Sequence, residues 1–317
     1  MKQLCTDLLA AVLVGMVLPG ILMNGAVFFL TREQAPVPEE TKSQTRYEPV
    51  LLRDSGDRLR EMDMNAYLTG VLLAEMPASF GEEALKAQAV AARTYARKAA
   101  VTGGKHGDGS ICADPACCQG YCAPESYLAR GGTQDAVQKV GEAVADTSGY
   151  VLTYEDALIE ATYFSCSGGS TEDAAAVWGA SFPYLQAVDS PGEEAAAVYE
   201  ETLSFTPAEF QEALGVSLSG NPRDWFTVTT YTEGGGVASM TIGGQAYPGT
   251  RLRSLLGLRS TAFAVEADMD RITITTKGYG HRVGLSQYGA DAMAAAGSSF
   301  EQILAHYYPG TLLVWQE

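Results

Sequence analysis

One acidic residue stands at the end of an apolar segment, where its carboxyl group could donate a proton. Glu75 follows Val71 by four residues and Leu72 by three, and helical spacing puts those apolar side chains on its face. An apolar environment and the negative end of a helix dipole both disfavour a carboxylate, so we expect a raised pKa for Glu75. A glutamate with a raised pKa can act as a general acid near neutral pH. The spacing alone favours the alternative, a surface glutamate on a helix that happens to end there.

A short polar stretch further along the chain could bind a metal ion. Its five candidate soft ligands are His106, Cys112, Cys117, Cys118 and Cys122. Tetrahedral zinc needs four such ligands. Disulfide bonds are the alternative, and an extracytoplasmic location would permit them. The chain has 6 cysteines, and setting aside Cys5 near the N-terminus leaves an odd number, which argues against complete pairing.

Two glycine-containing segments could line a binding cleft. In the first, Tyr163, Ser165 and Ser167 precede paired glycines, and such a turn can offer N–H groups and hydroxyls to a sugar. The second contains His281 and Gln287 and leads into a helix. Both segments could instead be simple turns whose glycines serve the backbone, with His281 as a core residue. Neither has the Gly-x-Gly-x-x-Gly pattern in a βαβ context, so we predict no dinucleotide site.

Two helices should position Glu75. Asp63 or Asn65 can cap a helix that ends near Met76, because Pro77 restricts the residue before it. Ser79, with Glu82 three residues later, is a candidate capping box for a longer alanine-rich helix. Its small residues would allow close packing against another element.

The remainder of the chain favours short strands followed by helices. Strands are predicted at 150–154, 158–164, 227–231, 237–242, 262–267 and 271–276. Two closing helices are predicted, one ending near residue 297 and one over 300–308. Because helices bracket the strands and do not alternate with them, we predict an α+β unit of one or two lobes.

Composition and the N-terminal segment constrain location and partners. The net charge of −17 would repel phosphate backbones, so nucleic acid is not an expected partner. The uncharged run over 8–30 is long enough to cross a bilayer, with a cleaved signal peptide as the alternative. We therefore predict a cytoplasmic tail (1–7), a single membrane span (8–30), a linker (31–48) and an extracytoplasmic domain (49–317). The positive-inside tendency gives this orientation weak support.

Three long motifs resemble the stage II sporulation protein D family, in the order found there. The first is YLTGVLLAEMPASF at 67–80, continued by EALKAQAVAARTYA at 83–96. The second is ATYFSCSGGSTE at 161–172 and the third is GYGHRVGLSQYGA at 278–290. Together they span about residues 60 to 310.

The resemblance implies an enzyme with a membrane anchor that acts on peptidoglycan during engulfment. The glutamate at the position of Glu75 is the catalytic acid of a lytic transglycosylase in that family, and the 6-hydroxyl of the sugar attacks to give a 1,6-anhydro product. One carboxyl then suffices, whereas hydrolysis with water ordinarily needs two. Asp63, Glu82 and Glu83 are nearby in sequence, so a second carboxylate stays open.

The resemblance also implies partners, a metal and further site residues. It places Tyr163, Ser165, Ser167, His281 and Gln287 around a substrate cleft for glycan strands, with a preference for strands stripped of stem peptides. It implies a cell-wall amidase and a membrane engulfment complex as partners. It implies structural zinc in the cysteine loop, with His106, Cys112, Cys117 and Cys118 as ligands. Where this chain has Cys117 the family often has histidine, which leaves open whether Cys122 replaces His106. The wider family includes amidase enhancers, so a non-enzymatic enhancer is the alternative function.

Overall fold

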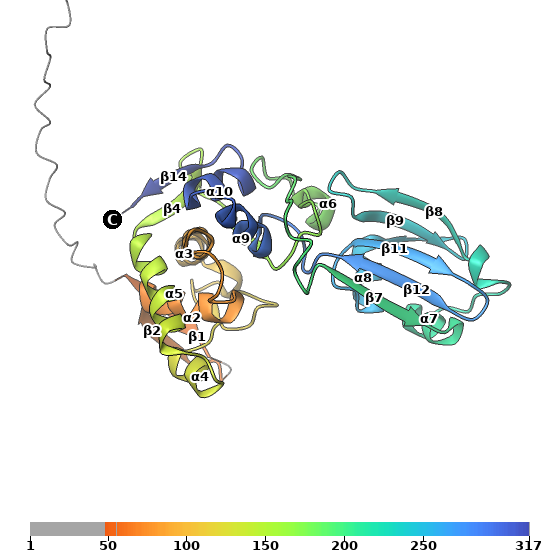
Figure 1. Cartoon of the computed structure of the whole chain (residues 1–317), viewed down its shortest axis with the longest axis horizontal. Helices are drawn as coiled ribbons and strands as arrows, with labels where there is room; N and C mark the ends of the chain where they lie inside the picture. The colour runs from red at the N-terminus through yellow and green to blue at the C-terminus, as the bar shows by residue number, and fades with distance from the viewer. Residues whose placement is uncertain (1–47, 55, 317) are drawn as a thin grey trace, which may run out of the picture. The chain divides into compact units, whose positions relative to one another are not determined.

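The computed structural model describes residues 48–54 and 56–316. The predicted tail, membrane span and nearly all of the linker lie outside the described residues. Within them, no helix is both long enough and apolar enough to span a bilayer. Helices and strands are mixed throughout (Figure 1), which confirms the α+β prediction.

The helix that carries Glu75 has the predicted limits. Helix α2 (Met64–Glu75) begins after Asp63, whose side chain accepts from the backbone N–H groups of Asn65 and Ala66. It ends at Glu75 because Met76 is extended, with φ −126° and ψ 143°, the conformation that a following proline favours. Asp63 is therefore the cap, and the carboxyl of Glu75 lies in the last turn.

The next helix, α3 (Glu82–Thr102), starts later than predicted. Gly81 is its N-cap and no side chain caps it, so the predicted Ser79–Glu82 capping box is wrong. The physical reason is a turn before the helix, in which the Phe80 N–H bonds to the Pro77 carbonyl and the Phe80 ring packs against Tyr288. The small residues of α3 are buried on most sides, and α3 contacts α2, α5, α9, α10 and β4 (Figure 1).

The first hydrophobic core gathers around α3. Its other helices are α4 (Pro124–Ala129), α5 (Gln134–Asp146), α9 (Gln287–Ala295) and α10 (Phe300–Tyr307), with the short α6 (Ala174–Trp178) beside them. Its strands are β1 (Pro49–Arg53), β2 (Leu59–Asp63), β3 (Ile111–Cys112), β4 (Tyr150–Tyr154), β5 (Ala157–Leu158), β6 (Tyr163–Phe164), β13 (Leu285–Ser286) and β14 (Leu312–Trp315). They form sheets in the orders β2–β1–β3, β14–β4–β5 and β13–β6.

One strand prediction needs correction. The run 158–164 is two short strands in different sheets, β5 beside β4 and β6 beside β13. The chain changes sheets between them, where the Thr162 N–H bonds to the Glu160 carbonyl. The parallel pairing of Leu285 with Tyr163 and of Ser286 with Phe164 brings the two predicted cleft segments side by side.

A second, separate core lies among strands that follow residue 200. Its sheets have the orders β10–β9–β8 and β11–β12–β7. The strands are β7 (Glu200–Phe205), β8 (Phe226–Tyr231), β9 (Val237–Ile242), β10 (Gln245–Pro248), β11 (Ala262–Ala267) and β12 (Ile272–Lys277), and the helices are α7 (Pro207–Leu214) and α8 (Gly249–Leu256). Two cores agree with the two-lobe version of the prediction.

A buried ion pair joins loops of the two cores. Arg282 and Glu172 are 2% and 1% exposed, and Arg282 Nη1 lies 2.9 Å from Glu172 Oε1. The same carboxylate oxygen accepts from Thr232 and Gly236 in the β8–β9 turn, and Arg282 Nη2 donates to the Gly234 carbonyl. These bonds fix the second lobe against the loop that follows β6.

Candidate functional site

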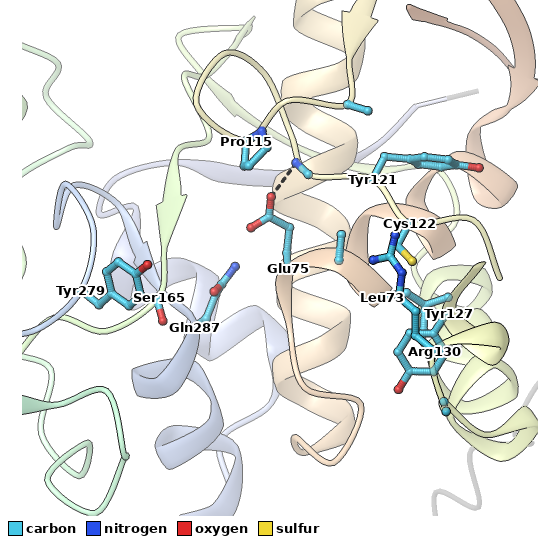
Figure 2. A pocket seen from close by; sticks show the side chains of 15 residues that line it. Leu73, Glu75, Pro115, Tyr121, Cys122, Tyr127, Arg130, Ser165, Tyr279 and Gln287 are labelled. Atoms are coloured by element: carbon cyan, nitrogen blue, oxygen red, sulfur yellow. Dashed lines mark hydrogen bonds between the residues drawn. The ribbon is translucent and has the colours of Figure 1, made fainter. Parts of the chain in front are cut away.

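The carboxyl of Glu75 is part-buried and held by one backbone donor. The Gly120 N–H donates a 2.6 Å hydrogen bond to Glu75 Oε1 (Figure 2). Burial raises the pKa of Glu75 above its ordinary value of 4.5, although the hydrogen bond from Gly120 works in the opposite direction. The sequence predicted this upward shift of the pKa. The Glu75 carboxyl therefore keeps its proton at a pH where an ordinary glutamate has lost it.

Glu75 lies where two cavities meet. One has a volume of about 810 Å³ and continues toward Tyr121, Tyr127 and Arg130 (Figure 2). The other has a volume of about 900 Å³ and continues toward Trp178 and its neighbours. Both include Glu75, Pro115, Ser165 and Tyr279 in their walls. We call the two cavities together the groove. A linear polymer bound along the groove would have the Glu75 carboxyl beside a bond within the chain, with part of the polymer in each cavity.

Tyr163 lies in the groove, where the sequence placed it. Its hydroxyl accepts a 2.8 Å hydrogen bond from Gln119 Nε2, and Gln119 Oε1 accepts one of 2.9 Å from Tyr67. Burial, together with the nearby charge of Glu75, raises the pKa of Tyr163 well above its ordinary value. Tyr163 is therefore a neutral hydroxyl beside the acid, and Gln119 is a supporting residue that the sequence reasoning missed.

The two predicted serines have different positions. Ser165 lines both cavities, and its carbonyl accepts from the Tyr288 N–H. Ser167 is fully buried; its hydroxyl accepts from the Gly169 N–H and its backbone N–H donates to Glu193. The structure therefore brings Ser165 to the groove and keeps Ser167 inside the turn, where it shapes the loop.

His281 lines the second cavity as a neutral ring. Its Nδ1 accepts a 3.1 Å hydrogen bond from the Val283 N–H, and its ring packs against the rings of Phe164 and Trp178. Desolvation, followed by the charge of Arg253, lowers the pKa of His281 to about 4. A histidine in this environment does not supply a proton near neutral pH, so its contribution is an aromatic wall.

Gln287 lies at the start of α9 and faces Glu75 (Figure 2). It is 4% exposed. Its amide lies close to the Glu75 carboxyl and lowers the pKa of Glu75, which opposes the larger effect of burial. The contact falls short of hydrogen-bond geometry, since Nε2 has no partner among the described residues. A buried N–H donor without a partner is costly, and here it is directed at the acid and available to a ligand.

Two exposed aromatic residues of the groove were missed from the sequence. Trp178 is 45% exposed and Tyr279 is also 45% exposed, and both line the second cavity. Large aromatic side chains left open in a groove suit the apolar faces of sugar rings. Tyr279 was within the third motif but was read as part of a turn, and no periodic pattern identified Trp178.

The structure contains no second free carboxylate beside Glu75 among the described residues that line the groove. Asp63 caps the opposite end of α2, Glu82 pairs with Lys86 at 2.6 Å, and Glu83 accepts from the Phe300 N–H. Glu160 lines the second cavity but pairs with Lys98 at 2.8 Å. Of the residues named as possible second carboxylates, none lines the groove.

The metal-ligand candidates form a tight cluster. One ligand atom from each of His106, Cys112, Cys117 and Cys118 lies within 4.8 Å of the others. The Cys117 and Cys118 sulfurs are 3.8 Å apart, and Cys118 Sγ lies 3.5 Å from His106 Nε2. Tetrahedral zinc with Zn–S bonds of about 2.3 Å places sulfurs about 3.8 Å apart, so the donor set fits zinc.

Cys122 lies apart from that cluster. Its sulfur contacts the Ala123 carbonyl and it lines the first cavity (Figure 2). The geometry thus brings His106 to the three cysteines, and not Cys122. None of the described cysteines is in a disulfide bond.

Comparison with known proteins agrees with this architecture. A family model described as "SpoIID: Stage II sporulation protein" matches residues 53–154. The chain belongs to the stage II sporulation protein D family, as the three motifs predicted. Stage II sporulation protein D of Bacillus subtilis (strain 168) is 40% identical over 82% of this chain and 76% of its own length. The Bacillus amyloliquefaciens protein of the same name is 40% identical over 86% of this chain and 80% of its own. A Bacillus subtilis "Amidase enhancer" is 32% identical over 78% of this chain and 40% of its own length.

Proposed function

We propose that this protein is a membrane-anchored lytic transglycosylase that cleaves the MurNAc–GlcNAc bond of peptidoglycan glycan strands during sporulation. The observation that carries the proposal is Glu75, a part-buried acid without an ion-pair partner among the described residues, in a groove with free space on both sides. Exposed aromatic rings in the same groove support a sugar ligand. Family membership supports a role in sporulation and at the cell wall.

A single carboxyl can complete this reaction. Protonated Glu75 gives its proton to the glycosidic oxygen as the C1–O bond breaks, and the leaving sugar departs with a free hydroxyl. The 6-hydroxyl of the remaining N-acetylmuramic acid then bonds to C1, and the Glu75 carboxylate accepts the proton of that hydroxyl. Glu75 is protonated again at the end, and no water is consumed. Water-dependent glycosidases ordinarily require a second carboxylate.

Neighbouring residues support both halves of the reaction. Burial keeps Glu75 protonated at the start. The Gly120 N–H holds Oε1, which leaves Oε2 free to exchange the proton with the sugar. Gln287 lines the first cavity and Tyr163 the second, so the Gln287 Nε2 group and the Tyr163 hydroxyl would orient the ring hydroxyls and acetamido groups.

The cysteine cluster suits a structural zinc ion. His106, Cys112, Cys117 and Cys118 would hold it, and bound zinc would order the loop that supplies Gly120. We propose no step of the reaction for the metal. The membrane anchor, the extracytoplasmic location and partnership with a cell-wall amidase and a membrane engulfment complex belong to the same proposal.

The second candidate function is stimulation of a separate cell-wall amidase, and the similarity to the amidase enhancer favours it. A carboxyl in a binding groove can contact a ligand without taking part in catalysis. Incubating the protein with glycan strands freed of stem peptides, and with no amidase present, separates the two functions. Anhydro ends detected by mass spectrometry on these strands would support the enzyme. Faster release of stem peptides from intact peptidoglycan by an added amidase, without anhydro ends, would support the enhancer.

A further inference from the structure

Arg253 gives the groove a positive charge from the second lobe. It lies on α8 (Gly249–Leu256), within the part of the chain that builds the second core. Its side chain nevertheless lines the second cavity, the one that also includes Glu75 and Trp178. Arg253, from the second core, therefore forms part of the wall of a groove whose acid, Glu75, belongs to the first core.

This guanidinium has no acidic partner among the described residues. Neighbouring arginines are paired, Arg259 with Glu201 at 2.9 Å and Arg282 with Glu172 at 2.9 Å. Acidic residues outnumber basic ones by 38 to 21 in this chain, yet none of the described ones pairs with Arg253. Arg253 is also part-buried, and desolvation lowers its pKa. Burying an unpaired charge is unfavourable, which points to an anion supplied by a ligand.

The surroundings of Arg253 contain neutral groups or groups that are already bonded. His281 is near enough for the charge of Arg253 to lower its pKa, and it is neutral. Among the other charged residues of the second cavity, Lys105 donates to the Cys117 carbonyl and Glu160 pairs with Lys98. Arg253 is thus a part-buried cation of this cavity for which the described residues supply no anion.

We propose that Arg253 binds a carboxylate of the glycan strand in this half of the groove. The inference rests on the proposed function, because it takes its ligand from the same substrate. The glycan backbone is neutral apart from the lactyl group of N-acetylmuramic acid, which ends in a carboxylate when no stem peptide is attached. With a peptide attached, the available carboxylates belong to the peptide. A planar guanidinium can bind either with two parallel hydrogen bonds.

The test measures binding in the full-length Glu75→Gln protein, so that cleavage does not enter. Three ligands of equal sugar length are titrated: peptide-free wall glycan, peptide-bearing wall glycan and a chitin oligosaccharide, which has no carboxylate. Arg253→Gln is compared with Arg251→Gln. Arg251 is on the same helix, packs over Tyr247 and does not line either cavity.

Arg253→Gln should weaken binding of a carboxylate-bearing strand about ten- to a hundredfold, the usual effect of losing a charge-assisted hydrogen bond. Chitin binding should change less than about twofold, and Arg251→Gln should leave all three ligands unaffected. A loss confined to peptide-free glycan identifies the lactyl carboxylate as the ligand; a loss confined to peptide-bearing glycan identifies the peptide. Equal losses for wall glycan and chitin, or no loss for either wall glycan, would overturn the inference. Either of these two results would leave the proposed cleavage untouched, because that reaction is tested separately by the anhydro ends that the wild-type protein produces.

Discussion

The backbone N–H of Gly120 donates a 2.6 Å hydrogen bond to Oε1 of Glu75. Gly120 follows Cys118 by two residues, so the loop that contains the metal-ligand cluster also supplies the contact to the acid. A Cβ atom added at Gly120 would lie 2.7 Å from Glu75 Oε1, closer than a normal contact. A side chain at this position would push the Glu75 carboxyl aside, whereas glycine lets the backbone N–H approach the carboxyl directly.

Gly120→Ala should displace the Glu75 carboxyl and lower the rate of strand cleavage about ten- to a hundredfold, since small misplacements of a catalytic group are costly. The variant should remain folded by circular dichroism. Gly141→Ala is the matched control, because nothing lies within 4 Å of a Cβ at that helical position and alanine favours helix. Full activity in Gly120→Ala would show that this contact does not position the acid.

The position of Gly120 illustrates what the sequence could not provide. Spacing and the proline at position 77 predicted the end of α2 and the location of Glu75, because both depend on local backbone preferences. The contact with Gly120 joins segments 45 residues apart and depends on how the cysteine loop folds over α2. No local signal encodes that geometry.

The pH dependence follows from the raised pKa of Glu75. As a proton donor, Glu75 should lose activity as pH rises through its raised pKa, because the carboxyl then enters the reaction without its proton. Its pKa is higher in the folded protein than in the unfolded chain, so it binds more protons when folded. Its stabilising contribution is complete below the ordinary value of 4.5 and is lost as pH rises through the raised value.

Glu75→Gln removes that titration. Its melting temperature should therefore equal that of the wild type near pH 4 and exceed it increasingly toward pH 7, as measured by calorimetry across this range. A variant that is less stable than wild type at pH 7 would show that the carboxylate is favourably bound in the groove, contrary to the direction of the pKa shift.

Cys112→Ser should release zinc and lower the melting temperature, since a structural zinc site contributes to folding stability. Elemental analysis of the purified protein measures the metal directly. Cys122→Ser is the control, because its sulfur lies outside the four-residue cluster, and its zinc content should stay unchanged. Metal retained in Cys112→Ser, or lost in Cys122→Ser, would contradict the ligand set.

Breaking the buried pair between the lobes should be costly. Glu172→Gln leaves the Arg282 charge buried without its partner, and such a change typically costs about 3–5 kcal/mol of unfolding free energy. Glu201→Gln removes the same charge from the more exposed pair with Arg259 and should cost about 1 kcal/mol or less. Chemical denaturation measures both. Similar small losses in the two variants would mean that the buried Glu172–Arg282 pair contributes no more to the free energy of unfolding than the more exposed Glu201–Arg259 pair.

Sequence reasoning identified most of the motif residues of the groove and was weakest for contacts between the lobes. The motif residues Tyr163, Ser165, His281 and Gln287 do line the groove, because the parallel pairing of β6 with β13 brings their segments together. Ser167 looked equivalent to Ser165 by type and position, yet it is buried inside the turn, where its backbone N–H donates to Glu193 and its hydroxyl accepts from the Gly169 N–H. Arg253 and Trp178 were not identified because only the tertiary arrangement brings them to the groove.

The central claim is that Glu75 transfers the proton in a cleavage that forms an anhydro sugar. The most direct measurement is mass spectrometry of peptide-free glycan strands after incubation with wild-type protein and with Glu75→Gln. We predict that the wild type produces 1,6-anhydro-N-acetylmuramic acid ends and that Glu75→Gln, although folded, produces none. Absence of these ends with the wild type, or their persistence with Glu75→Gln, would contradict the account.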